Sequence, residues 1–139
     1  DGITYPTAEH WMMAEKARLF QDHAALQKIL VSKTPAEAKE WGRNVLHFDQ
    51  DIWEEKRLDI VIKGNYHKFA QHPALQEYLI GTKQRILVEA SPVDSIWGIG
   101  LPRDHTDAAN PTRWKGLNLL GFALMEVRDW IIEVGNSRN

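Results

Sequence analysis

A carboxylate and an amine lie within the apolar face of the helix that the sequence predicts for Thr7 to Phe20. At about 100° per residue, Glu9 and Lys16 share an arc of roughly 160° with five apolar residues, namely Met12, Met13, Ala17, Leu19 and Phe20. The two charged residues are separated along the helix axis by about 10.5 Å, at 1.5 Å per residue. That is too far for direct pairing, but a ligand could sit between them. Because burying an unpaired charge costs several kcal/mol, the pattern predicts either a polar partner elsewhere or a binding site.

A structural interpretation of the same two residues is also open. A lysine can lay its stem along apolar surface while its ammonium group reaches water. A glutamate in the first turn of a helix is favoured by the helix dipole. On the helical pattern alone, the structural interpretation is the commoner one.

Composition limits the architecture and the class of partner. The chain has 139 residues, 43% of them hydrophobic, and six tryptophans, which predicts one domain with a real core. It has no cysteine, which suits a cytoplasmic protein, and no apolar run that predicts a membrane span or a signal peptide. A net charge of −2 argues against a broad nucleic-acid-binding face. Any nucleic-acid substrate would be held through a single nucleotide in a pocket.

Helices dominate the rest of the chain. Capping residues and apolar spacing predict further helices that open at Thr34-Pro35, at Asp49 or Asp51, at Pro73 and at about Lys115. The segment from Arg85 to Ala90 alternates in a pattern typical of a strand. Ser91 to Pro111 is predicted to be a long ordered loop.

The common catalytic and metal-binding motifs are missing. The sequence has no Gly-x-Ser-x-Gly, Walker or His-Glu-x-x-His motif. Gly98-Ile-Gly100 is no dinucleotide fingerprint, because no third glycine opens a helix. The six histidines show no metal-ligand spacing. We therefore expect neither a metal nor a cofactor.

Three long blocks in the right order carry a family resemblance: residues 1–17 (DGITYPTAEHWMMAEKA), 87–101 (LVEASPVDSIWGIGL) and 114–129 (WKGLNLLGFALMEVRD). Between them, the stretch from Trp53 through Arg57 to KFAQHPAL fits the middle of the same family. The chain resembles the NADAR family, also called YbiA-like. The resemblance implies an α+β fold, mostly helical with a few short strands. It also predicts that residues 1–139 form a single domain of the family that lacks its N-terminal segment.

The resemblance implies an N-glycosidase, a hydrolase that cleaves a bond between ribose C1 and nitrogen. One branch of the family is linked to ribosylamino pyrimidine phosphates of riboflavin synthesis, and another removes ADP-ribose from modified guanine in nucleic acid. The expected partner is therefore a small phosphoriboside or an ADP-ribosyl nucleotide. The alternative is a non-catalytic module that binds ADP-ribose or a related nucleotide.

The family pattern places Glu9 and Lys16 at the catalytic site, the same pair that the helical pattern picks out. Cleavage of an N-glycosidic bond builds positive charge on the sugar, which a carboxylate can stabilise while it moves protons. Glu9 fits this acid/base role. A lysine made less basic by desolvation could attack C1 and form a Schiff base, so Lys16 is the candidate nucleophile. The simpler alternative for Lys16 is a phosphate or ribose contact.

The loop supplies candidate substrate-binding residues, each with a structural alternative. Trp97 could stack on a base or anchor the core. Asp94 could accept hydrogen bonds from the ligand or form a turn after Pro92. Gly98 would let the backbone approach a ligand closely.

Three more candidates come from helices. Trp11 is either a second packing face or an aromatic platform, and Asn118 either contacts the ligand or satisfies nearby backbone. Arg57, like Arg103, is a candidate for phosphate binding, although an exposed salt bridge is the commoner fate of an arginine.

Overall fold

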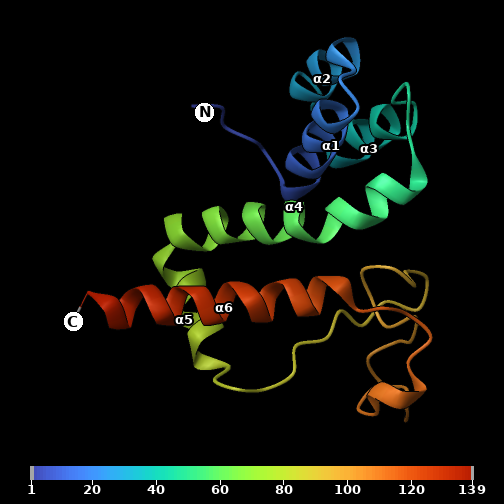
Figure 1. The fold of residues 1–139 in the computed structure, drawn as a ribbon. Coiled ribbons are helices and arrows are strands. Elements are labelled where there is room, and N and C mark those ends of the chain that lie inside the picture. Colours follow the sequence, from blue (N-terminus) through green and yellow to red (C-terminus); the bar gives the residue numbers. More distant parts are fainter. Residues whose placement is uncertain (1, 139) are drawn as a thin grey trace. The chain divides into compact units, whose positions relative to one another are not determined.

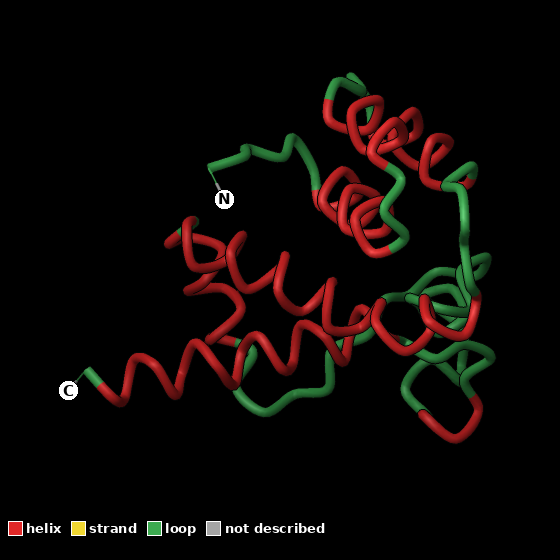
Figure 2. The backbone as a smooth tube through the Cα atoms, turned by 45° about the horizontal axis from the view of Figure 1, so that its top comes forward, coloured by secondary structure: helices red, strands yellow, loops and turns green. Residues whose placement is uncertain are grey.

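The computed structural model describes residues 2–138, and within that range the chain is helical without a strand (Figures 1 and 2). Six α-helices and one short 3₁₀-helix follow in this order: α1 (Ala8–Leu19), α2 (His23–Leu30), α3 (Pro35–Arg43), α4 (Gln50–Gln71), α5 (Pro73–Gly81), η1 (Pro111–Arg113) and α6 (Leu119–Ser137). The expected α+β class is therefore wrong. No helix in this range is both long and apolar enough to cross a membrane.

The chain divides into two compact units, one ending at Gly64 and the other beginning at Asn65. In the first unit, α1, α2 and α3 pack against one another (Figure 1). Their shared core is closed by the start of α4 and is built from nine buried residues: Met13, Ala14, Ala17, Phe20, Ala25, Ile29, Ala38, Val45 and Trp53. This core holds the helix that carries the predicted catalytic pair.

Local capping explains where the helices of the first unit begin. Thr7 accepts a hydrogen bond from the His10 amide at the start of α1, and Thr34 caps α3 with Pro35 in its first turn. Both starts were predicted. The helix α2, which begins after Asp22, was not predicted. The Asp22 carboxylate accepts hydrogen bonds from the Ala25 and Leu46 amides.

The second unit contains α5, α6 and a long connection between them. Tyr66, near the end of α4, contacts Trp130 of α6 edge-to-face at 5.6 Å between ring centroids. The predicted start of α5 at Pro73 is confirmed. The expected loop from Ser91 to Pro111 is an ordered run of turns.

The strand predicted for Arg85 to Ala90 is replaced by an extended segment that pairs with a side chain. Asn118 Nδ2 donates to the Leu87 carbonyl at 3.0 Å, and Asn118 Oδ1 accepts from the Glu89 amide at 2.9 Å. One carboxamide thus supplies the donor and the acceptor that a neighbouring strand would offer. Alternating residues indicate an extended backbone with two faces, whereas a sheet also requires a second strand. Within residues 2–138 the segment has none.

The helix expected from about Lys115 begins instead at Leu119. The preceding amides bond to the loop: those of Leu117, Asn118, Leu119 and Leu120 donate to the carbonyls of Ser95, Gly98, Ile96 and Trp97, respectively. Asn118 itself has φ 53°, a left-handed conformation that asparagine tolerates better than most residues. The spacing of apolar residues cannot predict this change of backbone direction, so the predicted helix start was too early.

Candidate functional site

The Glu9 carboxylate occupies an unusual environment near the N-terminus of α1. The residue is partly buried, and its Oε1 atom is fully buried without a hydrogen-bond partner among the described residues. Burial raises the pKa of Glu9, and the charges of Lys39, Arg43, His10 and Lys16 oppose this increase. The side chain is therefore easier to protonate than an exposed glutamate, which suits an acid that must donate a proton near neutral pH.

Lys16 lies two turns further along the same helix, beside two aromatic rings. Its Nζ atom is 4.6 Å from the centroid of Phe48 and 5.3 Å from that of Trp53. Burial lowers the pKa of Lys16, while the charge of Glu9 raises it. Lys16 forms no salt bridge with any residue that the structure describes. A less basic amine is more often neutral and nucleophilic.

A glycine allows α3 to approach α1 between these two charged residues. A Cβ atom on Gly42 would overlap the side chain of Met13, which lies one turn after Glu9 and almost one turn before Lys16. The buried Ala38 lies on the same side of α3, in the core with Met13. The close contact between α1 and α3 brings Lys39 and Arg43 of α3 near Glu9, where their charges act on its carboxylate.

Arg57 lies on α4, one turn after Trp53. It is only 8% exposed, and its Nε atom has no hydrogen-bond partner in the described part of the chain. Residues four apart share a helix face, so Arg57 lies on the face of α4 whose Trp53 contacts Lys16. The structure therefore places Arg57 in the unit that holds the predicted catalytic pair. It forms no salt bridge, the alternative, with any residue from 2 to 138.

Two neighbours of Glu9 have structural partners. The ring of His10, which is fully buried, joins the Thr7 hydroxyl at 2.7 Å to the Ser32 carbonyl at 2.9 Å, so it connects the start of α1 to the end of α2. Trp11 Nε1 donates to the Ile60 carbonyl at 2.8 Å, and its indole packs against Gly64. These contacts favour the packing interpretation of Trp11, and its predicted role in substrate binding stays a prediction.

The other four predicted substrate-binding residues lie in the second unit. Asp94 Oδ1 accepts hydrogen bonds from the Ile96 and Trp97 amides at 2.9 and 2.8 Å, the turn geometry that was its structural alternative. The Trp97 side chain is partly buried, and its carbonyl accepts from the Leu120 amide. Binding roles for both residues remain predictions.

Gly98 and Asn118 support the same loop. A Cβ atom on Gly98 would lie 2.9 Å from the carbonyl oxygens of both Asp94 and Glu89, so its close backbone approach is to the chain itself. Asn118 is fully buried, and its amide is used by Leu87 and Glu89. These two hydrogen bonds favour the interpretation that Asn118 satisfies nearby backbone groups.

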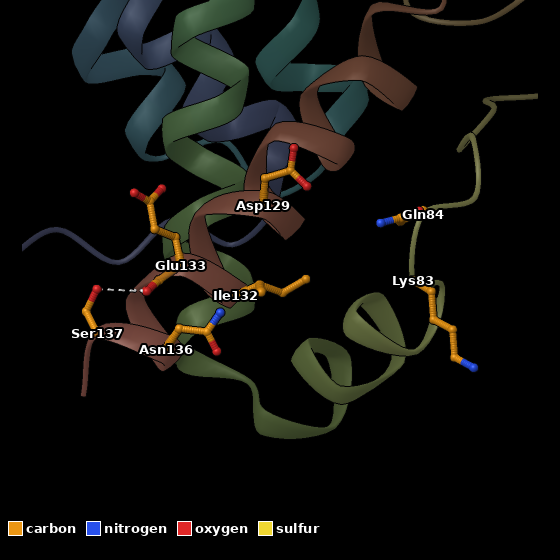
Figure 3. A pocket seen from close by; sticks show the side chains of 7 residues that line it. All are labelled: Lys83, Gln84, Asp129, Ile132, Glu133, Asn136 and Ser137. Carbon is orange, nitrogen blue, oxygen red and sulfur yellow. Dashed lines mark hydrogen bonds between the residues drawn. The ribbon is translucent and has the colours of Figure 1, made fainter. Parts of the chain in front are cut away.

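A cavity in the second unit holds none of the predicted site residues. It has a volume of about 480 Å³ and lies between the turn at Lys83 and Gln84 and the last turns of α6 (Figure 3). Figure 3 shows the Lys83 ammonium pointing away from the carboxylates of Asp129 and Glu133. Between residues 2 and 138, no three histidine or acidic side chains are grouped closely enough to hold a metal ion.

Sequence reasoning missed Lys39 and Arg43. Their spacing of four residues on the predicted helix was visible, but a basic pair on a short helix usually indicates a solvated face. Their significance depends on the contact between α1 and α3, which no local pattern encodes. The predicted pair Glu9 and Lys16 needed no tertiary information beyond the helical arc.

Comparison with known proteins gives a consistent assignment. The sequence profile of the NADAR domain matches residues 1–132. N-glycosidase R617 of Acanthamoeba polyphaga mimivirus is 42% identical over 125 residues, which cover 90% of this chain and 74% of that protein. N-glycosidase YbiA of Shigella boydii serotype 4 is 34% identical over 129 residues, covering 93% of this chain and 72% of that protein.

A solved NMR structure, that of the E. coli protein YbiA, matches with a TM-score of 0.78 at 31% identity, covering 97% of this chain and 72% of that chain. The likeness confirms the expected YbiA-like fold. The names of the two relatives confirm the expected type of activity, that of a hydrolase of N-glycosyl bonds. On the extent of the profile match and of these identities, the chain belongs to the NADAR domain family.

Proposed function

We propose that this protein hydrolyses the bond between C1 of a phosphorylated ribose and a nitrogen atom, with Glu9 as acid/base and Lys16 as nucleophile. The observation that carries the proposal is the pair itself: two partly buried, oppositely charged groups on one helix, neither in a salt bridge with a described residue. Burial moves the pKa of Glu9 up and that of Lys16 down. Both changes favour the neutral forms, an acid that can donate a proton and an amine that can attack carbon.

The reaction takes two stages. The Lys16 amine attacks C1 of the ribose and the C1–N bond breaks, while Glu9 donates a proton to the departing nitrogen. The sugar ring then opens and a proton passes from Nζ to the ring oxygen, so that C1 and Lys16 form a protonated Schiff base, which borohydride can reduce. Water then attacks C1 of the adduct with Lys16, and the Glu9 carboxylate accepts a proton from that water. The amine of Lys16 is released, and the net change is the addition of one water across the C1–N bond. Each residue ends in its starting protonation state.

Basic side chains support a substrate that carries negative charge. Arg57 is buried without an ion-pair partner among the described residues, and guanidinium groups are well suited to phosphate and ribose oxygens. We assign Arg57 to substrate binding. A ribosylamino pyrimidine phosphate and an ADP-ribosylated guanine both fit this chemistry, because each carries a phosphate on the ribose to be cleaved.

Two substrates and a trapping reaction test the proposal. The purified protein is incubated separately with a ribosylamino pyrimidine phosphate and with DNA that carries ADP-ribosylated guanine, and released base is measured. Borohydride reduction during turnover should trap a covalent sugar adduct on Lys16, which Lys16→Met should abolish while the helical circular dichroism spectrum is retained. Release of base without a trapped adduct would restrict Lys16 to a binding role. Failure to release base from either riboside would overturn the proposed function.

A binding module for ADP-ribose is the second candidate, because the same basic side chains would hold the ligand without turnover. Calorimetry with ADP-ribose separates the two: tight binding together with no release of base from either riboside favours the module. A cytoplasmic location is part of the proposal, supported by a sequence without cysteine.

A further inference from the structure

Two basic residues of α3 form a pair beside the proposed site. Lys39 and Arg43, here called the α3 basic pair, are four residues apart and therefore neighbours on one face of the helix. Both are exposed, and neither forms a salt bridge or a side-chain hydrogen bond with any residue in the range 2–138. Their charged groups are thus available to a ligand.

Packing of α3 against α1 sets the position of this pair. Ala38 and Gly42, the residues just before Lys39 and Arg43, are buried, and Gly42 lies against Met13 of α1. Glu9 lies one turn before Met13. Both members of the α3 basic pair act electrostatically on the Glu9 carboxylate, yet neither forms a salt bridge with it. Their charges therefore act on Glu9, while their side chains remain free of ion pairs with the described residues.

The local charge balance differs from that of the whole protein. The chain has a formal net charge of −2. Beside Glu9, however, the side chains of Lys39 and Arg43 add two formal positive charges, and both act on the Glu9 carboxylate. A dianionic phosphate near Lys39 and Arg43 would balance these two positive charges.

We propose that the α3 basic pair binds the phosphate on C5 of the ribose whose C1–N bond is cleaved. This inference rests on the proposed function and deepens it, because it makes the phosphate a requirement of the same site. A ribose 5-phosphate and the ribose of an ADP-ribosyl group both carry a phosphate ester on C5, so the chemistry covers both substrates. The phosphate is held on the α3 side, which leaves C1 free to face Glu9.

The test compares substrates with and without the phosphate. Hydrolysis of a ribosylamino pyrimidine and of its 5-phosphate is measured for the wild type, for Lys39→Gln, for Arg43→Gln and for the double variant. Each single variant should reduce kcat/KM for the phosphorylated substrate by about tenfold, the loss typical of one charge-assisted hydrogen bond, and the double variant by more. Because both charges also act on Glu9, hydrolysis of the unphosphorylated riboside can change, but by less than that of the phosphorylated one, so the preference for phosphate falls. The same variants assayed on ADP-ribosylated guanine show whether the diphosphate uses the same pair.

Lys33→Gln is the matched control, because Lys33 is exposed just before α3 and its ammonium group has no partner among the described residues. It should keep the full phosphate preference, and Arg43→Lys should keep part of it. An unchanged preference in the double variant would overturn the inference while leaving the proposed function standing.

Binding of ribose 5-phosphate, measured by calorimetry, gives a readout independent of turnover. If the wild type hydrolyses neither riboside, the proposed function fails. The α3 basic pair is then judged by whether the double variant weakens binding of ribose 5-phosphate at least tenfold. Equal binding by wild type and double variant would overturn the inference in that case too.

Discussion

The charged side chains of the proposed site in the first unit and the buried Asn118 of the second unit differ in whether hydrogen bonds or ion pairs compensate for their burial. In the first unit, Glu9, Lys16 and Arg57 are wholly or partly buried, and the described residues offer them no ion pair. In the second unit, the buried Asn118 uses both ends of its carboxamide on backbone atoms. Arg128 donates from Nη1 to the Thr82 hydroxyl and to the Arg85 carbonyl, although its Nε atom has no hydrogen-bond partner among the described residues.

This difference distinguishes buried polar groups that stabilise the fold from buried polar groups that destabilise it. A buried polar side chain with its hydrogen bonds made contributes to stability, whereas one without them costs free energy. Asn118 shows the first kind and Glu9 the second. On the proposed function, a ligand supplies the partner that Glu9 lacks among the described residues.

The largest expected effect is loss of activity in the first unit without loss of stability. Glu9→Gln removes the proposed proton donor, and Lys16→Met removes the proposed nucleophile while keeping an apolar stem beside Phe48 and Trp53. Each should lower kcat/KM by about 10²–10⁴, the range typical of acid–base groups. Neither should lower the midpoint of thermal unfolding. A variant that retains activity within tenfold of the wild type would remove that residue from the mechanism.

Glu15→Gln is the matched control for this experiment. Glu15 lies on the same helix but forms a salt bridge with Arg18 at 2.7 Å. Its loss should leave kcat/KM unchanged and alter the free energy of unfolding by less than about 1 kcal/mol. A loss of activity at Glu15 comparable with that at Glu9 would mean that any charge change on α1 disturbs the site.

Features encoded locally could be predicted from the sequence. The start of α1 at Thr7 and that of α3 at Thr34 follow from capping residues, and the placement of Glu9 and Lys16 follows from the helical period. The helix α2 was missed although Asp22 caps it, because the segment is only eight residues long and carries little periodic signal.

Features that depend on contacts distant in sequence could not be predicted. The segment at Leu87 was expected to be a strand, and its partner is a side chain 31 residues away. The α3 basic pair becomes part of the proposed site only because Gly42 packs on Met13. In each case the sequence shows the residue type, while the partner is set by packing.

In the second unit, we expect a substitution of Asn118 to destabilise the fold. Asn118→Leu removes two hydrogen bonds and leaves the Leu87 carbonyl and the Glu89 amide without partners. It should reduce the free energy of unfolding by about 2–4 kcal/mol, measured by urea denaturation. Asn136→Leu, at an exposed position on the same helix, should change it by less than about 0.5 kcal/mol. Equal effects at the two positions would mean that the bridging amide does not support the fold.

A smaller loss is expected where α3 meets α1. Gly42→Ala places a methyl group against Met13, and the resulting overpacking should cost about 1–3 kcal/mol of the free energy of unfolding. Activity should fall as well, because the helices that carry Glu9 and the α3 basic pair are pushed apart. The control is Gly135→Ala on α6, where a Cβ atom meets nothing and helix propensity should stabilise the protein by up to about 1 kcal/mol. A neutral Gly42→Ala would show that Met13 moves aside easily.

The smallest effect is a dependence of stability on pH that differs in sign between two carboxylates of the first unit. Burial raises the pKa of Glu9 above 4.5 in the folded state, so its ionisation disfavours folding. The stability of the wild type relative to Glu9→Gln should therefore fall as the pH rises through the raised pKa, and should not depend on pH well below 4.5. Hydrogen bonds from the Leu46 and Ala25 amides lower the pKa of Asp22 below 3.8.

The stability of the wild type relative to Asp22→Asn should thus be highest above 3.8 and be lost as the pH falls through the lowered pKa. Urea unfolding of the three proteins across this pH range measures both trends. Two trends of the same sign would contradict the distinction between a carboxylate that lacks hydrogen bonds and one that has them. Opposite trends would tie the unpaired state of Glu9 to a free-energy cost that the folded protein bears at neutral pH, where a ligand of the site can relieve it.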